Sequence, residues 1–172
     1  MRLLDLPATT KDGDHHVVVE SPRGSAVKLK YDANLQAFKL SRPLPVGLAY
    51  PFDWGFVPGT QGPDGDPIDA MLVSDFAIPT GTVVPCHLIG VLEVEQNDGH
   101  GGRERNDRVI GVPTTAARIE LLQHVDQLPA RFRDELARFF VDVTHFEKKA
   151  VEILGWRSPE AARALITRAV HG

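Results

Sequence analysis

The chain has 172 residues, of which 42% are hydrophobic and 24% charged, the balance of a globular protein with a single domain over residues 1–172. Its formal net charge of -4 argues against a nucleic-acid partner, since such proteins usually carry a basic stripe, but it leaves room for a local basic pocket. The lone cysteine, Cys86, excludes an intrachain disulfide, and the lack of a signal peptide or a membrane-spanning apolar run predicts a cytoplasmic protein with no membrane partner.

The chain up to Pro113 predicts a β structure. Short runs of strand-forming residues alternate with Gly, Pro and Asp clusters, and the longest run bends at Gly90. Short strands at this spacing favour a closed or nearly closed barrel. The predicted strands are residues 16–20, 26–31, 35–40, 70–73, 83–95 and 109–112.

After Val112 the period of the apolar residues becomes that of a helix. Pro129 suits a first helical turn, and a second helix is predicted from the N-cap Ser158, with Pro159 at its first position. We expect both helices to pack outside the barrel. The apolar face of the first helix consists of Leu128, Phe132, Leu136, Phe139, Phe140 and Val143.

Two long loops are predicted between the strands. The first spans residues 50–69 and carries aromatic, Pro, Gly and acidic residues. The second, residues 96–108, is rich in Gly and in charges of both signs, which predicts a flexible, solvated hairpin tip.

The first loop ends in an acidic turn, Asp64-Gly65-Asp66-Pro67-Ile68-Asp69. Carboxylates this close repel one another, so a fold that gathers them needs compensating cations. Hard divalent ions such as Mg²⁺ take oxygen ligands, which makes the turn a candidate metal site. A surface turn would use the same residue types, and the spacing alone does not decide between the two interpretations.

The surroundings of the turn favour a metal site. Residues 49–56 are too aromatic for a plain solvent loop, and the buried run after the turn would hold Asp69 rigidly. Carboxylates for metals together with basic groups for phosphoryl oxygens predict a site that cleaves phosphate bonds. Charged residues that need partners or a wet cavity also lie on or beside the predicted strands: Glu20, Lys28, Lys30 and Arg42.

The motifs, in this order, resemble those of the family I soluble inorganic pyrophosphatases. The resemblance runs from Glu20 to the C-terminal helix, and the acidic turn is its most specific element. It implies an OB-like β-barrel of about five strands flanked by C-terminal helices, and a homo-oligomer. The other matching residues are Ser21-Pro22, Lys28, Arg42, Tyr50-Pro51, Gly90-Val91-Leu92, Val112-Pro113, Phe139-Phe140 and Gly155-Trp156.

The resemblance also implies a metal site. Asp64 and Asp69 would bind the catalytic metals, and Glu20 would reach an outer metal through water. The implied cofactor is Mg²⁺, with Mn²⁺ or another divalent cation as a substitute. Asn106 stands where the family has a metal-binding aspartate, and Asp107 beside it is the candidate to restore that ligand.

A small phosphate-bearing molecule is the implied substrate. Asp66 would accept a proton from the attacking water. Lys28 and Arg42 would hold the phosphate groups, and Tyr50 would support the pocket by hydrogen bonding. These four residues form the implied catalytic set.

Several residues depart from the family pattern inside the implied site. Trp54 and Arg108 remain candidates for substrate binding. Because negative charge is lost at the metal positions, fewer or weaker metals are expected, and charges in the lengthened loop 96–108 could compensate. The departures are Lys30 for a glutamate, Trp54 for a tyrosine, Gln96 and Asn106 for aspartates, Arg108 for a lysine, and Val143 and Thr144 for a phosphate-holding tyrosine and lysine.

Three hypotheses therefore remain from the sequence. The first is a Mg²⁺-dependent inorganic pyrophosphatase, a hydrolase with a rebuilt outer site. The second is a phosphohydrolase of the same fold that acts on another diphosphate-containing substrate, with Val143 and Thr144 widening the pocket. The third is a catalytically weak relative that binds phosphate or nucleotides.

Overall fold

A computed structural model describes residues 2–119 and 121–170 of the chain. The elements follow one another with strands first and the α-helices near the C-terminus, as the change in period predicts. In chain order they are η1 (Leu3–Asp5), β1 (His15–Ser21), β2 (Val27–Asp32), β3 (Ala37–Pro43), β4 (Asp53–Phe56), β5 (Asp69–Leu72), β6 (Val83–Asn97), β7 (Arg103–Arg105), β8 (Arg108–Pro113), η2 (Val125–Gln127), α1 (Ala130–Asp142), β9 (Glu152–Arg157) and α2 (Pro159–Ala169).

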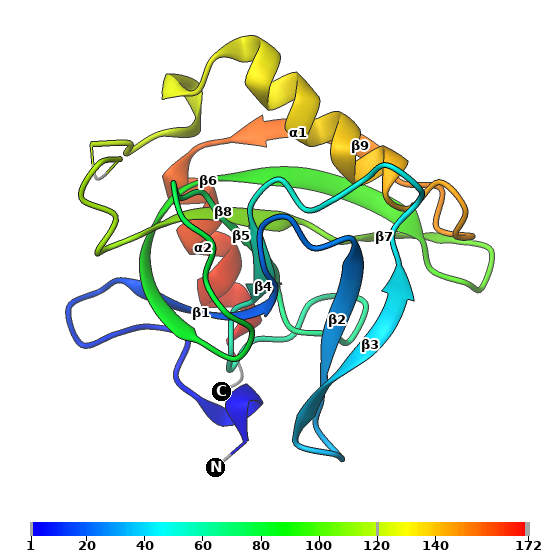
Figure 1. The fold of residues 1–172 in the computed structure, drawn as a ribbon, viewed down its shortest axis with the longest axis horizontal. Coiled ribbons are helices and arrows are strands. Elements are labelled where there is room, and N and C mark those ends of the chain that lie inside the picture. The colour runs from blue at the N-terminus through cyan, green and yellow to red at the C-terminus, as the bar shows by residue number, and fades with distance from the viewer. Residues whose placement is uncertain (1, 120, 171–172) are drawn as a thin grey trace.

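Five of the strands close into a ring (Figure 1). β1 pairs with β4, β4 with β5, β5 with β8, and β8 with β6, and β6 returns to pair with β1. The β5–β8 pair is parallel and the other pairs of the ring are antiparallel. β7 and β9 extend the sheet along β6, while β2 and β3 form a separate hairpin. The prediction of a mainly β fold with five strands closed on themselves is confirmed.

The ring strands are buried on both faces because successive side chains point to opposite sides of a strand. In β5, Met71 belongs to one core cluster, whereas Ala70 and Leu72 belong to the other. The Met71 cluster contains Leu136 and Phe140 of α1. This two-sided burial explains why the strands form continuous apolar runs instead of alternating ones.

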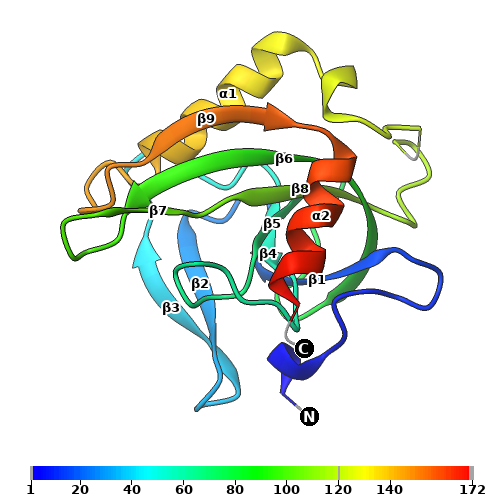
Figure 2. The same ribbon diagram turned by 180° about the vertical axis from the view of Figure 1, so that it is seen from behind.

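Each α-helix covers a different face of the ring. Figure 2 shows α2 lying across the ring and α1 alongside β9. Pro129 immediately precedes α1, and the Ser158 hydroxyl accepts a hydrogen bond from Ala161 N at 3.4 Å at the start of α2. Ala162 and Ile166 of α2 are buried against the second core cluster. Within the described residues, no helix has the length and apolar character to cross a membrane.

β4 is the main correction to the predicted elements, because residues 50–69 were expected to form one loop. Its four residues are all buried, so it lacks the alternation that marks a half-exposed strand. Asp53 is tolerated there because its carboxylate accepts hydrogen bonds from Arg23 N at 2.8 Å and Ile78 N at 3.0 Å. A Cβ at Gly55 would lie 1.9 Å from Val18 O, so only glycine allows β4 this close to β1.

The loop of residues 96–108 is also more ordered than predicted. β7 pairs with the end of β6, so the tip of the hairpin is confined to residues 98–102. β9, which was not predicted, pairs with β6 through a register shift and contains Gly155 at φ +135°. None of its residues is fully buried, and Glu-Ile-Leu-Gly-Trp-Arg does not alternate polar with apolar residues, which hides it in the sequence.

Candidate active site

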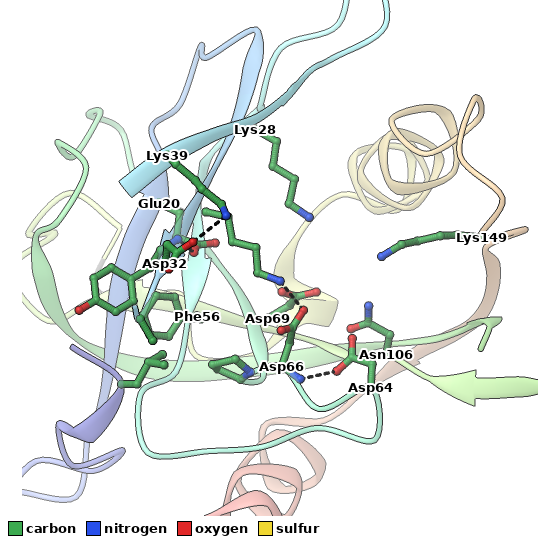
Figure 3. A pocket seen from close by; sticks show the side chains of 15 residues that line it. Glu20, Lys28, Asp32, Lys39, Phe56, Asp64, Asp66, Asp69, Asn106 and Lys149 are labelled. Atoms are coloured by element: carbon green, nitrogen blue, oxygen red, sulfur yellow. Dashed lines mark hydrogen bonds and ion pairs between the residues drawn. The ribbon is translucent and has the colours of Figure 1, made fainter. Parts of the chain in front are cut away.

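The residues of the acidic turn open onto a pocket of 340 Å³ beside the β2–β3 hairpin (Figure 3). Segments that are far apart in the sequence contribute to its walls: β1, β2, the acidic turn, the start of β5, the residue after β7 and the segment between α1 and β9. The charged and amide side chains that line it are Glu20, Lys28, Lys30, Asp32, Lys39, Asp64, Asp66, Asp69, Asn106 and Lys149.

Local hydrogen bonds shape the acidic turn. Gly62 N donates to Asp66 O at 2.7 Å, and Asp66 N donates to the Asp64 carboxylate at 3.1 Å. Gly65 adopts φ +84°, a conformation that glycine reaches without strain. Asp69 then begins β5, where it is in register with Phe56 and Arg108 of the neighbouring strands. The turn therefore projects its carboxylates from a closed loop fixed to the ring.

The neighbouring carboxylates of the turn affect the pKa of Asp64. Burial raises its pKa, and the negative charges of Asp69 and Asp66 raise it further. A cation bound among these carboxylates would relieve the repulsion. Among residues 2–119 and 121–170, however, no group of three or more acidic, histidine or cysteine side chains is close enough to enclose a metal ion.

Lys30 makes a contact that the sequence did not reveal. Its ammonium lies 2.6 Å from the Asp66 carboxylate, with side chains that are 42% and 53% exposed. Burial lowers the pKa of Lys30, but the hydrogen bond to Asp66 and the negative charge of Asp66 outweigh that effect and raise it. The sequence predicted Lys30 as a charge reversal beside Lys28, whereas the structure places it directly against Asp66.

Glu20 is buried and Lys28 is half-buried in the wall of the pocket. Glu20 is 6% exposed, and its carboxylate accepts a hydrogen bond from Tyr31 N at 2.7 Å. Burial raises the pKa of Glu20 to about 7, although the Tyr31 hydrogen bond acts against the rise. Burial also lowers the pKa of Lys28, while the charge of Asp69 acts to raise it. Both groups are thus poorly solvated, so they gain from a ligand of opposite charge.

A smaller cavity of 30 Å³ continues the pocket, since Lys28, Asp69, Asn106 and Lys149 line both. We call the other residues that line this smaller cavity the far wall. They are Arg42, Tyr50, Trp54, Arg108, Phe140, Val143, Thr144 and Glu147. The sequence-predicted residues Arg42, Tyr50, Trp54 and Arg108 therefore lie together around this smaller cavity, which Asp69 of the acidic turn also lines.

Arg108 is the most desolvated cation of the far wall. It is 4% exposed, and its guanidinium lies 4.9 Å from the Phe140 ring centroid and 5.9 Å from that of Trp54. Burial lowers the pKa of Arg108, and its Nε has no hydrogen-bond partner among the described residues. A buried cation with a spare N–H donor is a natural contact for a phosphate oxygen.

Other contacts fix the remaining residues of the far wall. Tyr50 stacks on Trp54 with ring centroids 6.0 Å apart, and burial raises the pKa of Tyr50. Arg42 forms an ion pair with Glu147. Val143 is buried, and neither it nor Thr144 carries a charge to the pocket.

Gln96 and Asn106, the two amides for which the resemblance implies aspartates, form a hydrogen bond with each other. Gln96 is 2% exposed, accepts a hydrogen bond from Asn106 Nδ2 at 3.2 Å, and donates to Glu104 at 3.1 Å. Asn106 lines the pocket and Gln96 does not. The two amides therefore join the start and the end of the hairpin just outside the acidic turn.

Asp107 does not line the pocket. Its carboxylate accepts hydrogen bonds from Val94 N at 2.9 Å and from Arg105 at 3.0 and 2.9 Å. To serve as the metal ligand expected from the sequence, it would have to leave these partners. The sequence missed Lys149 instead, although two adjacent lysines a few residues after Thr144 were a signal for it.

The pocket thus combines hard oxygen donors with partly desolvated lysine and arginine side chains, the chemistry of a site that binds phosphate groups and a divalent cation. Comparison with known proteins gives the same answer. The sequence model of the family described as inorganic pyrophosphatase matches residues 17–172. The chain belongs to the inorganic pyrophosphatase family.

Individual relatives match over nearly the whole chain. The inorganic pyrophosphatase of Synechocystis is 35% identical over 99% of this chain and 98% of that protein, and the one from Thermus thermophilus is 38% identical over 89% of both. The crystal structure of the Thermus thermophilus enzyme superposes with a TM-score of 0.91 at 33% identity, covering 99% of this chain and 97% of that one. Members of this family depend on metal ions.

Proposed function

We propose that the chain hydrolyses inorganic pyrophosphate to two phosphates and uses Mg²⁺ as its metal. The observation that carries the proposal is the convergence of Asp64, Asp66 and Asp69 with Lys28 on one pocket in a chain of this family. Within the residues that the structure describes, no contact or cavity favours another diphosphate substrate.

The donor set fits Mg²⁺. This ion prefers carboxylate oxygens, keeps several waters and commonly uses one or two protein carboxylates, so a cage of three acids is not required. Asp64 and Asp69 would hold it, with Glu20 and Asn106 next to its water ligands. When bound, Mg²⁺ would lower the pKa of a coordinated water and neutralise phosphate charge.

Asp66 is the residue that we assign as proton acceptor. Its carboxylate faces the pocket, and the attacking water would lose its proton to it. The Lys30 ammonium now occupies one oxygen of this carboxylate. Lys30 must therefore shift, or share Asp66 with the water, when a metal and substrate bind.

The basic residues would hold the two phosphate groups. Lys28 lies at the junction of the two cavities, and Arg42 and Arg108 lie on the far wall. Cations there stabilise the charge that grows on the leaving phosphate. Tyr50 and Trp54 would support this wall by packing under Arg108 and Phe140.

Phosphate release from pyrophosphate with and without Mg²⁺ tests the proposal, with Asp66→Asn as the matched variant. General-base catalysis typically contributes ~10²- to 10⁴-fold, so we expect a loss of that size in kcat. Wild-type protein that releases no more phosphate than Asp66→Asn would overturn the proposal. A panel of nucleoside and sugar diphosphates in the same assay checks for a better substrate.

We also propose a cytoplasmic homo-oligomer. The lone thiol, Cys86, is fully buried, which suits a reducing compartment. Leu40 and Phe146, which are 62% and 84% exposed, are large apolar side chains of the kind that subunit contacts cover. Light scattering on a sizing column would detect the oligomer, and a monomer at micromolar concentration would contradict this assignment.

A further inference from the structure

We propose that Lys149 supplies a phosphate-binding cation to the far wall, and that the hairpin formed by β6 and β7 holds the segment that delivers it. The inference rests on the proposed function, because it names a substrate-binding residue of the same site. It assigns a role both to a lysine outside the matching motifs and to the lengthened loop.

Lys149 reaches the pocket from the segment between α1 and β9. It lines both the 340 Å³ pocket and the 30 Å³ cavity, so it stands at the junction of the acidic turn and the far wall. Figure 3 shows its side chain pointing into the pocket on the side of Lys28 and Asn106. Its neighbour Lys148 is exposed and lines neither cavity.

The far wall has a cationic position to fill. Thr144 stands where the resemblance implies a lysine, but its hydroxyl donates to Phe140 O at 3.1 Å and Val141 O at 3.2 Å, back into α1. Val143 offers only apolar surface. A substrate phosphate that approached these residues would meet no positive charge from them.

Lys149 has no competing partner in the part of the chain that the structure describes, since no acidic side chain there forms an ion pair with it. Its charge acts on Lys28 across the junction, where it adds to the effect of burial in lowering the pKa of Lys28. Two lysines that repel each other around a cavity gain from a polyanion placed between them.

The hairpin fixes the backbone on both sides of Lys149. Asn97 N donates to Lys149 O at 2.6 Å, and Asn97 Nδ2 donates to Lys148 O at 3.3 Å. Arg103 Nη1 bridges Ala150 O at 2.8 Å and Asn97 Oδ1 at 3.0 Å. Ala150 adopts φ +42°, an uncommon conformation for a residue other than glycine, and the Arg103 bond helps to hold it there.

The test measures binding of imidodiphosphate, a non-hydrolysable analogue of pyrophosphate, by calorimetry at saturating Mg²⁺. A charge-assisted contact of this kind predicts about 10-fold weaker binding for Lys149→Ala. Lys149→Arg should retain most of the affinity, and Lys148→Ala should bind as the wild type does. In steady-state assays, Lys149→Ala should raise KM for pyrophosphate.

Two further variants test the supporting role of the hairpin and the position of the cation. Arg103→Ala should weaken binding by less than Lys149→Ala does, and adding it to Lys149→Ala should cost nothing more. Thr144→Lys in the Lys149→Ala background should recover part of the affinity, because it returns a cation to the same wall.

The outcomes separate this inference from the proposed function. If the wild type turns over pyrophosphate and Lys149→Ala binds the analogue as tightly as Lys148→Ala, the inference is wrong and the function stands. If the wild type gives no turnover, but affinity for the analogue falls selectively with Lys149→Ala, the function is wrong and Lys149 still binds phosphate.

Discussion

The acidic turn and the far wall of the pocket are built in opposite ways. The turn is contiguous: Asp64, Asp66 and Asp69 are fixed by hydrogen bonds within a few residues and by the start of β5. The far wall collects residues from β3, β4, β8, α1 and the segment after it. A contiguous site can be recognised from its spacing, whereas a site assembled from distant segments can receive the same charge from a different segment.

The largest effect should separate two aspartates that the sequence names as metal ligands, Asp69 of the acidic turn and the candidate replacement Asp107. Asp69 lines the pocket, so Asp69→Asn should lower kcat by at least ~10²-fold, the range for loss of one charge-stabilising group in a catalytic site. Asp107 is held by Arg105 and Val94 N outside the pocket, so Asp107→Asn should change kcat little at saturating Mg²⁺. The check is steady-state hydrolysis of pyrophosphate by both variants.

The melting temperature of Asp107→Asn is a second measurement that tests the role of Asp107. Asp107→Asn should lower the melting temperature, because it removes the charge of a partly buried carboxylate. That carboxylate accepts a hydrogen bond from Val94 N and forms an ion pair with Arg105. Equal losses of kcat in Asp69→Asn and Asp107→Asn would show that Asp107 joins the acidic turn when Mg²⁺ binds. The distinction between a pocket residue and a structural residue of the hairpin would then be wrong.

A smaller effect concerns the charge that faces the acidic turn. Lys30→Glu replaces an ammonium bound to Asp66 with the glutamate that the sequence resemblance implies at this position. Since the pair is half exposed, its loss accounts for at most about 1 kcal/mol, so Mg²⁺ should bind up to about 5-fold more tightly. Calorimetric titration with Mg²⁺ in the absence of substrate would measure this.

Lys39→Glu is the matched control. Lys39 lines the same pocket but pairs with Asp32 at 2.6 Å, away from the acidic turn. It should leave Mg²⁺ affinity closer to the wild-type value. A Lys30→Glu variant that binds Mg²⁺ no better than Lys39→Glu would mean that Lys30 does not compete with the metal for Asp66.

The smallest expected effect is on stability and lies outside both the acidic turn and the far wall, where β1 pairs with β6. His15 is buried opposite Cys86, and burial lowers its pKa from the usual 6.5. As the pH falls below 6.5, the unfolded chain binds a proton at His15 more readily than the folded chain does, so the free energy of unfolding decreases. Denaturant unfolding of the wild type and of His15→Gln between pH 5.5 and 7.5 (about one pH unit on either side of the usual value) would isolate this contribution by difference, because Glu20, with a pKa raised to about 7, contributes in the opposite direction.

His15→Gln should remove this loss of stability at low pH and should leave the Mg²⁺ titration unchanged. The loss should also persist in the presence of a chelator, because His15 does not line either cavity. An unchanged loss in His15→Gln would assign the pH response to another group.

The sequence predicted elements that express a local rule. The long run of residues 83–95 corresponds to β6, and a register shift does fall at Gly90. Pro129 and Ser158 correctly mark the starts of the two α-helices. Glu20, Lys28 and the acidic turn line one pocket, although their catalytic roles stay predictions.

Features that depend on distant partners were beyond the sequence. β4 needs the surroundings of β1 and β5 to bury an aspartate and a tryptophan on a strand. The contact of Lys30 with Asp66 joins residues that are 36 positions apart. The access of Lys149 depends on backbone bonds to Asn97 that no periodicity encodes.

The closure of the ring by β1 and β6 depends on segments that are synthesised at very different times. Residues 15–18 can pair with β6 only after residues 83–86 have been synthesised. β6 in turn pairs with β8 and β9, which lie still later in the chain. Such long-range pairing slows folding, and it leaves a partly synthesised chain with open strand edges. The edge of β1 that pairs with β6 therefore stays open to other chains until residues 83–86 have been synthesised.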